Sequence, residues 1–114
     1  MTEEMMVRKA EGKWVVRAGG AVLGETSNAL ELSENNMLPV IYFPLSDIAM
    51  PFLEAAERRK ASPTLGEAQF YSIETKSTSL TDAAWCLQEP KGALERLAGH
   101  LGFRISDKVT VEQL

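Results

Sequence analysis

The chain has 114 residues, of which 45% are hydrophobic and 25% charged, the balance of one soluble globular domain. Its formal net charge of −4 argues against general binding to nucleic acid or an anionic membrane, because both require clustered Lys and Arg side chains. The N-terminus has no apolar run of signal-peptide length, and nowhere do about 18 apolar residues run together, so we expect a cytoplasmic protein with no nucleic-acid and no membrane partner.

The N-terminal part is predicted to contain a β-hairpin at residues 13–25, because Gly19 and Gly20 supply the positive φ angles that a two-residue turn needs. Pairing outward from this turn assigns alternate side chains to a core face: Trp14, Val16, Ala18, Ala21 and Leu23. Residues 27–34 alternate between apolar and polar side chains, as in a half-buried strand. Residues 38–43 are almost wholly apolar, which indicates a central strand covered on both faces.

Two later segments have the composition of short helices. Residues 52–60 combine strong helix formers with acids early and bases late, and Asp47 precedes them as a candidate cap. This helix should end before Pro63, because the residue before a proline disfavours the helical conformation. The second helix should begin near Pro90, within residues 90–101. Its apolar side chains repeat at helical spacing: Leu94, Leu97, Ala98 and Leu101.

The segment 61–74 organises the C-terminal half of the chain. Pro63 and Gly66 predict a turn, and the aromatic and β-branched residues that follow predict a strand. Residues 82–87 should return as the next strand, with Trp85 buried against the core face of the hairpin. Two further segments are the last strand candidates: residues 103–105 and 108–111.

Several spaced segments share a pattern with one known family. They are Gly24-Glu-Thr-Ser, where the family has Ala-Asp-Ser, then Tyr42-Phe-Pro-Leu-Ser-Asp-Ile, Ala83-Ala-Trp, Pro90, and Asp107-Lys-Val. Over about residues 7–111 the chain thus resembles the domain of unknown function family 427 (DUF427). These matches are specific together and weak singly.

The centre of the pattern departs from the family. There the family has Cys-Pro-Tyr-Lys-Gly-x-Ala-x-Tyr-Trp, and this chain has Ser62-Pro-Thr-Leu-Gly-Glu-Ala-Gln-Phe-Tyr. The Pro, Gly and Ala positions hold, whereas Ser62, Thr64 and Leu65 replace the family's Cys, Tyr and Lys. Any chemistry that the family's motif performs with a thiol or an amine is therefore lost at these positions.

The resemblance implies a mainly β fold of the β-tent kind, with two packed antiparallel sheets and one or two short helices in a single domain, residues 1–114. It implies no established activity. Related tent folds hold zinc through paired Cys-x-x-Cys motifs, which this chain lacks. Cys86 is the only cysteine and His100 the only histidine, whereas a structural zinc ion usually takes four ligands from these residue types. We therefore expect no metal and no cofactor.

The turn and strand at residues 58–71 predict a non-catalytic module that binds a small polar or anionic molecule, or a short peptide. Arg59 would supply the charge, since an Arg fork matches carboxylate and phosphate geometry. Aromatic side chains would supply flat walls with a polar end. The residues predicted to border the cleft are Tyr42, Asp47, Arg59, Glu67, Tyr71 and Trp85.

Each of these residues also has a structural interpretation, as a core aromatic, a cap, a strand end or a solvated helix end. Two further functions therefore stay open. In the first, the protein is an enzyme in which Asp47 and Glu67 converge as a general acid and base. In the second, it is a structural subunit whose exposed apolar strand builds a homodimer.

Overall fold

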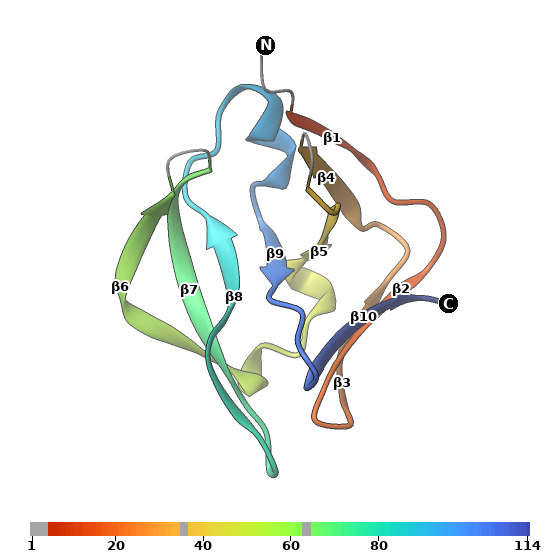
Figure 1. Cartoon of the computed structure of the whole chain (residues 1–114), viewed down its shortest axis with the longest axis vertical. Helices are drawn as coiled ribbons and strands as arrows, with labels where there is room; N and C mark the ends of the chain where they lie inside the picture. The colour runs from red at the N-terminus through yellow and green to blue at the C-terminus, as the bar shows by residue number, and fades with distance from the viewer. Residues whose placement is uncertain (1–4, 35–36, 63–64) are drawn as a thin grey trace.

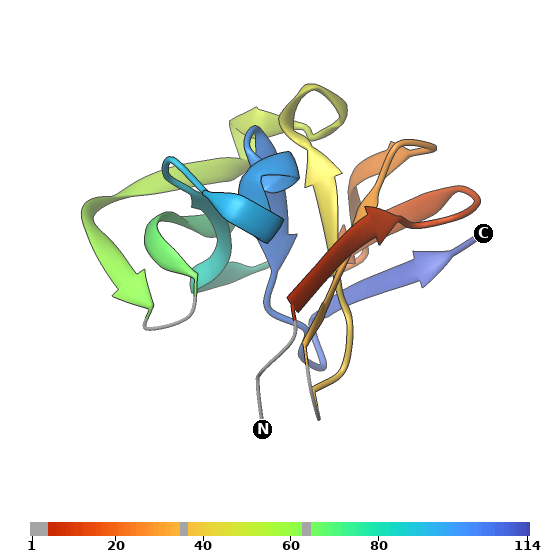
Figure 2. The same cartoon turned by 90° about the horizontal axis from the view of Figure 1, so that it is seen from above.

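The computed structural model describes residues 5–34, 37–62 and 65–114, without the side chains of residues 58–60 and 62. The fold is mainly β, as predicted, and consists of two antiparallel sheets. The larger sheet has seven strands in the order β1-β4-β5-β9-β8-β7-β6, and the smaller has three in the order β10-β2-β3. Figures 1 and 2 show the smaller sheet at one side of the molecule and β6, β7 and β8 at the other, with β4, β5 and β9 between them.

The strands occupy most of the described chain. They are β1 (Met5–Lys9), β2 (Trp14–Ala18), β3 (Ala21–Thr26), β4 (Leu30–Glu34), β5 (Val40–Pro44), β6 (Leu53–Ser62), β7 (Gly66–Glu74), β8 (Ser79–Leu87), β9 (His100–Phe103) and β10 (Val109–Gln113). Three 3-10 turns connect them: η1 (Leu45–Asp47), η2 (Met50–Phe52) and η3 (Gly92–Leu97).

The predicted hairpin is confirmed as β2 and β3. Ala18 pairs with Ala21 across a turn in which Gly19 and Gly20 have φ angles of 55° and 86°. Val16 and Leu23 are buried on its core face. The register shifts between Val16 and Arg17, which pair with Gly24 and Val22, so Leu23 lies at a β-bulge that the alternation alone did not predict.

The apolar strand β5 lies in the interior of the larger sheet, as predicted. Tyr42 and Phe43 are both fully buried, although successive side chains of a strand point to opposite faces. Each face of the sheet therefore has its own core. Phe43 belongs to the cluster between the two sheets, whereas Tyr42 belongs to a second cluster that η3 covers with Leu94 and Leu97.

The predicted helix at residues 52–60 is wrong. Most of this segment forms β6, which pairs with β7 from Leu53 opposite Ile73 to Ser62 opposite Gly66. Helix propensity is a weak preference, and the backbone hydrogen bonds to β7 override it. Asp47 does not act as a cap either, because it ends η1, where no side chain caps the turn. The predicted turn at residues 63–64 lies outside the described residues.

The predicted helix at residues 90–101 is also wrong, although three of its four apolar positions are buried, Leu94, Leu97 and Leu101. It is replaced by the 3-10 turn η3 and by β9. Gly92 and Gly99 have φ angles of 61° and 74°, outside the right-handed helical region, so they bound a short turn. Leu94 and Leu97 still share a face because they are three residues apart, and both are buried.

Trp85 does not face the hairpin, which corrects a further expectation. It packs on the cluster beneath η3, and Cys86 points the other way into the cluster between the sheets. The strand alternation was predicted correctly, but the sequence did not identify which face of β8 met which layer. The last strands, β9 and β10, lie within a few residues of the predicted ranges.

Candidate functional site

A largely apolar pocket of about 370 Å³ lies at β7 and β8. We call it the aromatic pocket, and it is lined by Ala61, Leu65, Ala68, Phe70, Trp85, Leu87 and Arg104. Its walls follow from strand register, because Ala68 pairs with Leu87 and Phe70 with Trp85, so that these side chains share one face. The volume lies in the range of small-molecule sites.

Trp85 is held in place by Tyr42. The Trp85 indole Nε1 donates a hydrogen bond of 2.9 Å to the Tyr42 hydroxyl oxygen, and the two rings meet edge to face at 6.2 Å and 84°. Burial raises the pKa of Tyr42 to about 12, although the hydrogen bond from Trp85 acts in the opposite direction. At neutral pH, Tyr42 is therefore an uncharged phenol whose hydroxyl oxygen holds the Trp85 indole in position.

Gly102 makes room for this ring pair. In the sheet it lies between Tyr42 and Trp85, because it pairs with Tyr42 on one side and with Trp85 on the other. A Cβ atom at this position would lie 2.9 Å from Cε2 of both rings, closer than packed atoms tolerate. Phe70 completes the aromatic wall, with its ring centroid 6.2 Å from that of Trp85.

Arg104 supplies the charge at the aromatic pocket. It follows β9 directly, its backbone N–H donates to the carbonyl of Ala83 at 2.8 Å, and its side chain is exposed. The ion pairs among the described residues involve Arg8, Lys13 and Arg17 instead. The guanidinium of Arg104 is therefore available to an anion, as far as the described side chains are concerned.

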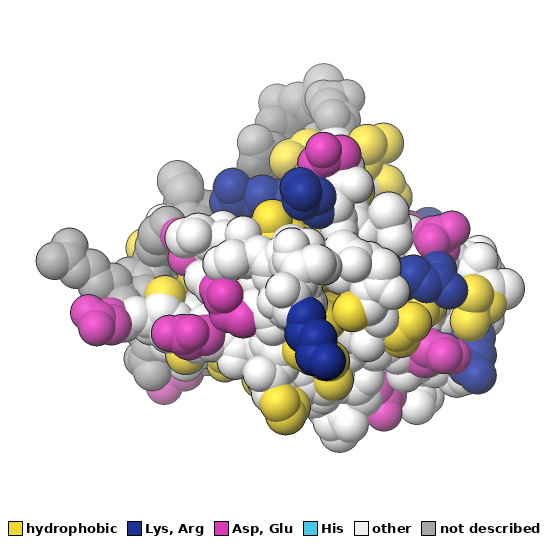
Figure 3. Space-filling model, turned by 90° about the horizontal axis from the view of Figure 1, so that it is seen from below, with side chains coloured by type: hydrophobic (Ala, Val, Ile, Leu, Met, Phe, Trp, Pro, Cys, Tyr) yellow, Lys and Arg dark blue, Asp and Glu magenta, His cyan; other side chains and the backbone are white. Residues whose placement is uncertain are grey.

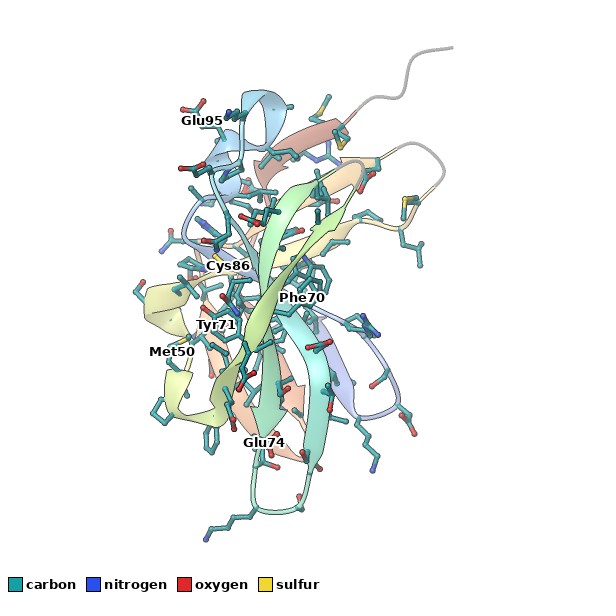
Figure 4. The ribbon with its side chains drawn as sticks, turned by 90° about the vertical axis from the view of Figure 1, so that its left-hand side faces the viewer. Met50, Phe70, Tyr71, Glu74, Cys86 and Glu95 are labelled. Atoms are coloured by element: carbon teal, nitrogen blue, oxygen red, sulfur yellow. The ribbon has the colours of Figure 1, made fainter. Side chains whose placement is uncertain are left out.

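The predicted cleft residues fall in different places. Tyr42 and Trp85 are in contact. Tyr71 lies on the opposite face of β7 from Phe70, as Figure 4 shows, because the two are successive residues of one strand, and it pairs with Ala84 rather than with Trp85. Tyr71 packs on the cluster between the sheets, and burial raises its pKa. It therefore does not line the aromatic pocket.

Asp47 has a structural partner. The hydroxyl of the buried Thr26 donates to Asp47 Oδ2 at 2.7 Å and accepts from the backbone N–H of Asn28 at 2.9 Å. Glu67 is exposed at the start of β7, and β9 and β8 lie between that strand and β5, after which Asp47 follows. At about 4.8 Å per strand the two segments are separated by roughly 14 Å, so these carboxylates do not form an acid and base pair.

The side chain of Arg59 lies outside the described part of the chain, so its predicted role is not tested by the geometry. Its backbone pairs with Gln69 after a bulge between Ala55 and Arg59. The sequence interpretation missed Phe70. The alternation of side chains along β7 would have placed Phe70 on the same face as Trp85, but only with knowledge of how β7 and β8 pair. The sequence interpretation also missed Arg104, which carries no local sequence signal.

Three further observations concern the surface, the metal-binding groups and the helices. On the face shown in Figure 3, basic side chains are interspersed with acidic and apolar ones. Among the described residues, no three or more His, Cys, Asp or Glu side chains gather closely enough to hold a metal ion. No helix in the described part of the chain is long and apolar enough to cross a membrane.

The comparison with curated proteins found no match. A family model described as a domain of unknown function (DUF427) matches residues 6–113, which is almost the whole chain. This match confirms the resemblance that the spaced segments indicated. The chain therefore belongs to the DUF427 family.

Proposed function

We propose that this protein is a non-catalytic binding module that holds a small molecule in the aromatic pocket. The single observation that carries the proposal is the fixed indole of Trp85, hydrogen-bonded to Tyr42 and flanked by Phe70 on the wall of a 370 Å³ hollow. A wall that is already ordered costs little conformational entropy on binding, which favours affinity. The pocket adjoins the turn and strand at residues 58–71, where a cleft was predicted.

The lining defines the chemistry of the ligand. Apart from Arg104, all the lining side chains that the structure describes are apolar, so the ligand would be a mainly apolar, flat molecule with one anionic group at its edge. A binding role fits better than catalysis, because the described lining contains no carboxylate, thiol, hydroxyl or imidazole to act as an acid, base or nucleophile. The proposal thus replaces Arg59 with Arg104 as the anion-binding residue.

The experiment is a thermal-shift screen of aromatic carboxylates, followed by calorimetry on the wild type, Arg104→Gln and Lys108→Gln. Lys108 is an exposed base four residues away that does not line the aromatic pocket, so it controls for net charge. Arg104→Gln should lower affinity about tenfold, as the loss of a charge-assisted contact does, while Lys108→Gln leaves it nearly unchanged. A ligand that binds all three proteins equally would remove this pocket from consideration.

A further inference from the structure

A second hollow of about 330 Å³ lies between the two sheets, on the opposite side of the segment that carries Arg104. We call it the intersheet pocket. The smaller sheet contributes Trp14 from β2 and Val111 from β10, and the larger sheet contributes Ile41 and Phe103. Most of this wall is apolar and only partly buried, and the neighbouring Ile105 is 59% exposed, so the hollow opens to solvent.

Glu31 is the one charged residue in the described lining of the intersheet pocket. Its side chain is only 19% exposed, and Oε1 pairs with Nε of Arg8 at 3.4 Å. The Arg8 side chain is 63% exposed, and such surface pairs contribute little free energy. A carboxylate accepts about four hydrogen bonds, so Glu31 keeps capacity for a second cation.

The aromatic walls of the intersheet pocket are already fixed. The indole Nε1 of Trp14 donates to the carbonyl of Glu11 at 3.0 Å, and the amide of Gln113 donates to the same carbonyl at 2.9 Å. Phe103 stacks edge to face on Phe43, with ring centroids 5.8 Å apart. Two ordered aromatic rings beside one largely buried carboxylate are the elements that bind organic cations.

We propose that the intersheet pocket binds an organic cation, an amine carried on a small apolar or aromatic body, with Glu31 as its counter-charge and Trp14 and Phe103 as its walls. This proposal is independent of the function proposed for the aromatic pocket. Phe103 and Ile105 line the intersheet pocket while Arg104 between them lines the aromatic pocket. The two sites would therefore select ligands of opposite charge from opposite faces of one extended segment.

The two tryptophans allow each pocket to be observed separately, because Trp14 lines one and Trp85 the other. The experiment titrates the wild type with 2-phenylethylammonium and, separately, with 3-phenylpropionate, an anion of similar size, and follows both indole N–H signals by NMR. The amine should shift the Trp14 signal to saturation and leave that of Trp85 in place. Trp14→Phe assigns the signals.

Three variants test the role of the charge. Glu31→Gln should weaken binding of the amine about tenfold or more, because a charge-assisted contact is lost while the shape is kept. Glu112→Gln removes an exposed carboxylate that pairs with Arg17 on the smaller sheet and should leave the affinity unchanged. Arg8→Gln should tighten binding, because it removes the cation that competes for Glu31.

Four results would overturn the proposal: no saturable shift of the Trp14 signal, an equal response to the amine and the anion, undiminished binding by Glu31→Gln, or weaker binding by Arg8→Gln. A shift of the Trp85 signal by 3-phenylpropionate bears only on the aromatic pocket, so the two proposals can fail separately. The same spectra report whether each variant is folded.

Discussion

The indole Nε1 of Trp85 donates to the hydroxyl of Tyr42 at 2.9 Å. The contact links β8 to β5 across Gly102, which lies on the strand between them. Because this contact joins the second core cluster to the wall of the aromatic pocket, it couples stability to the proposed binding site. Changes at Tyr42 or Gly102 should therefore alter both.

Tyr42→Phe tests the hydrogen bond alone. The substitution keeps the ring and leaves the Trp85 N–H without its partner, so it should lower the free energy of unfolding by about 1–3 kcal/mol. Denaturant unfolding measures the change. Tyr71→Phe is the matched control, since no described residue is in hydrogen-bond contact with its hydroxyl, and its effect should stay within about 0.5 kcal/mol. Equal effects of the two variants would contradict the assignment.

Gly102→Ala tests the close approach of the rings. The new methyl group would lie 2.9 Å from Cε2 of both Tyr42 and Trp85, so the rings or the backbone must shift, and we expect the hydrogen bond between the rings to weaken. Overpacking of this kind typically costs about 1–3 kcal/mol. Thermal unfolding measures the loss, and a shifted Trp85 indole signal shows that the ring has moved. A variant with wild-type stability and spectrum would show that the site tolerates a side chain.

The pH dependence of stability should report the buried phenol. Tyr42 has a folded pKa of about 12 against 10 in the unfolded chain, so the folded state holds the proton more tightly. Stability is fully present below pH 10 and falls as the pH rises from about 10 to 12, because only the unfolded chain then releases the proton. The slope contributed by this group approaches about 1.4 kcal/mol per pH unit.

Tyr42→Phe separates this group from the others that titrate in the same range. Burial also raises the pKa of Tyr71 and of Cys86, and both contribute a loss of the same sign. The wild type should therefore lose more stability between pH 10 and pH 12 than Tyr42→Phe does. Parallel curves for the two proteins would mean that Tyr42 ionises as easily in the fold as in the unfolded chain.

Thr26→Val tests the contact that ties β3 to η1. The isosteric valine removes the hydroxyl that donates to Asp47 and accepts from the N–H of Asn28, and leaves both groups without that partner. The expected loss is about 1–3 kcal/mol in the free energy of unfolding, measured with denaturant. Thr110→Val, at an exposed strand position, should change stability little. If Thr26→Val left the free energy of unfolding unchanged, the hydrogen bond between Thr26 and Asp47 would not contribute to stability.

The fold was predictable where short-range pattern and backbone pairing agree. The Gly19-Gly20 turn and the apolar strand around Tyr42 are examples, because turn chemistry and burial on both faces are visible in the sequence. The segment 52–60 was not predictable in this way. Its helix-forming side chains are overridden by long-range pairing with β7, which no local pattern encodes.

The site was predictable in part for the same reason. Tyr42 and Trp85 were identified as aromatic wall residues, but their contact depends on the position of β9 between their strands. Tyr71 was assigned to the cleft from its side-chain type and its position on the strand after the turn, and the cross-strand register places it on the other face. Arg104 enters the aromatic pocket only through the path of the chain after β9, which has no signature in the sequence.

Phe70 and Tyr71 give the sharpest test of the aromatic pocket, because they are neighbours in β7 with opposite orientations. Phe70 lines the pocket beside Trp85, whereas Tyr71 packs between the sheets. Phe70→Leu should lower affinity for an aromatic carboxylate about three- to tenfold, the worth of one aromatic contact. Tyr71→Leu removes a ring of similar size and should leave affinity unchanged in protein that remains folded. Calorimetry on both variants measures the difference. If Tyr71→Leu weakened binding and Phe70→Leu did not, the ligand would occupy the face between the sheets, and the aromatic pocket would not be the site.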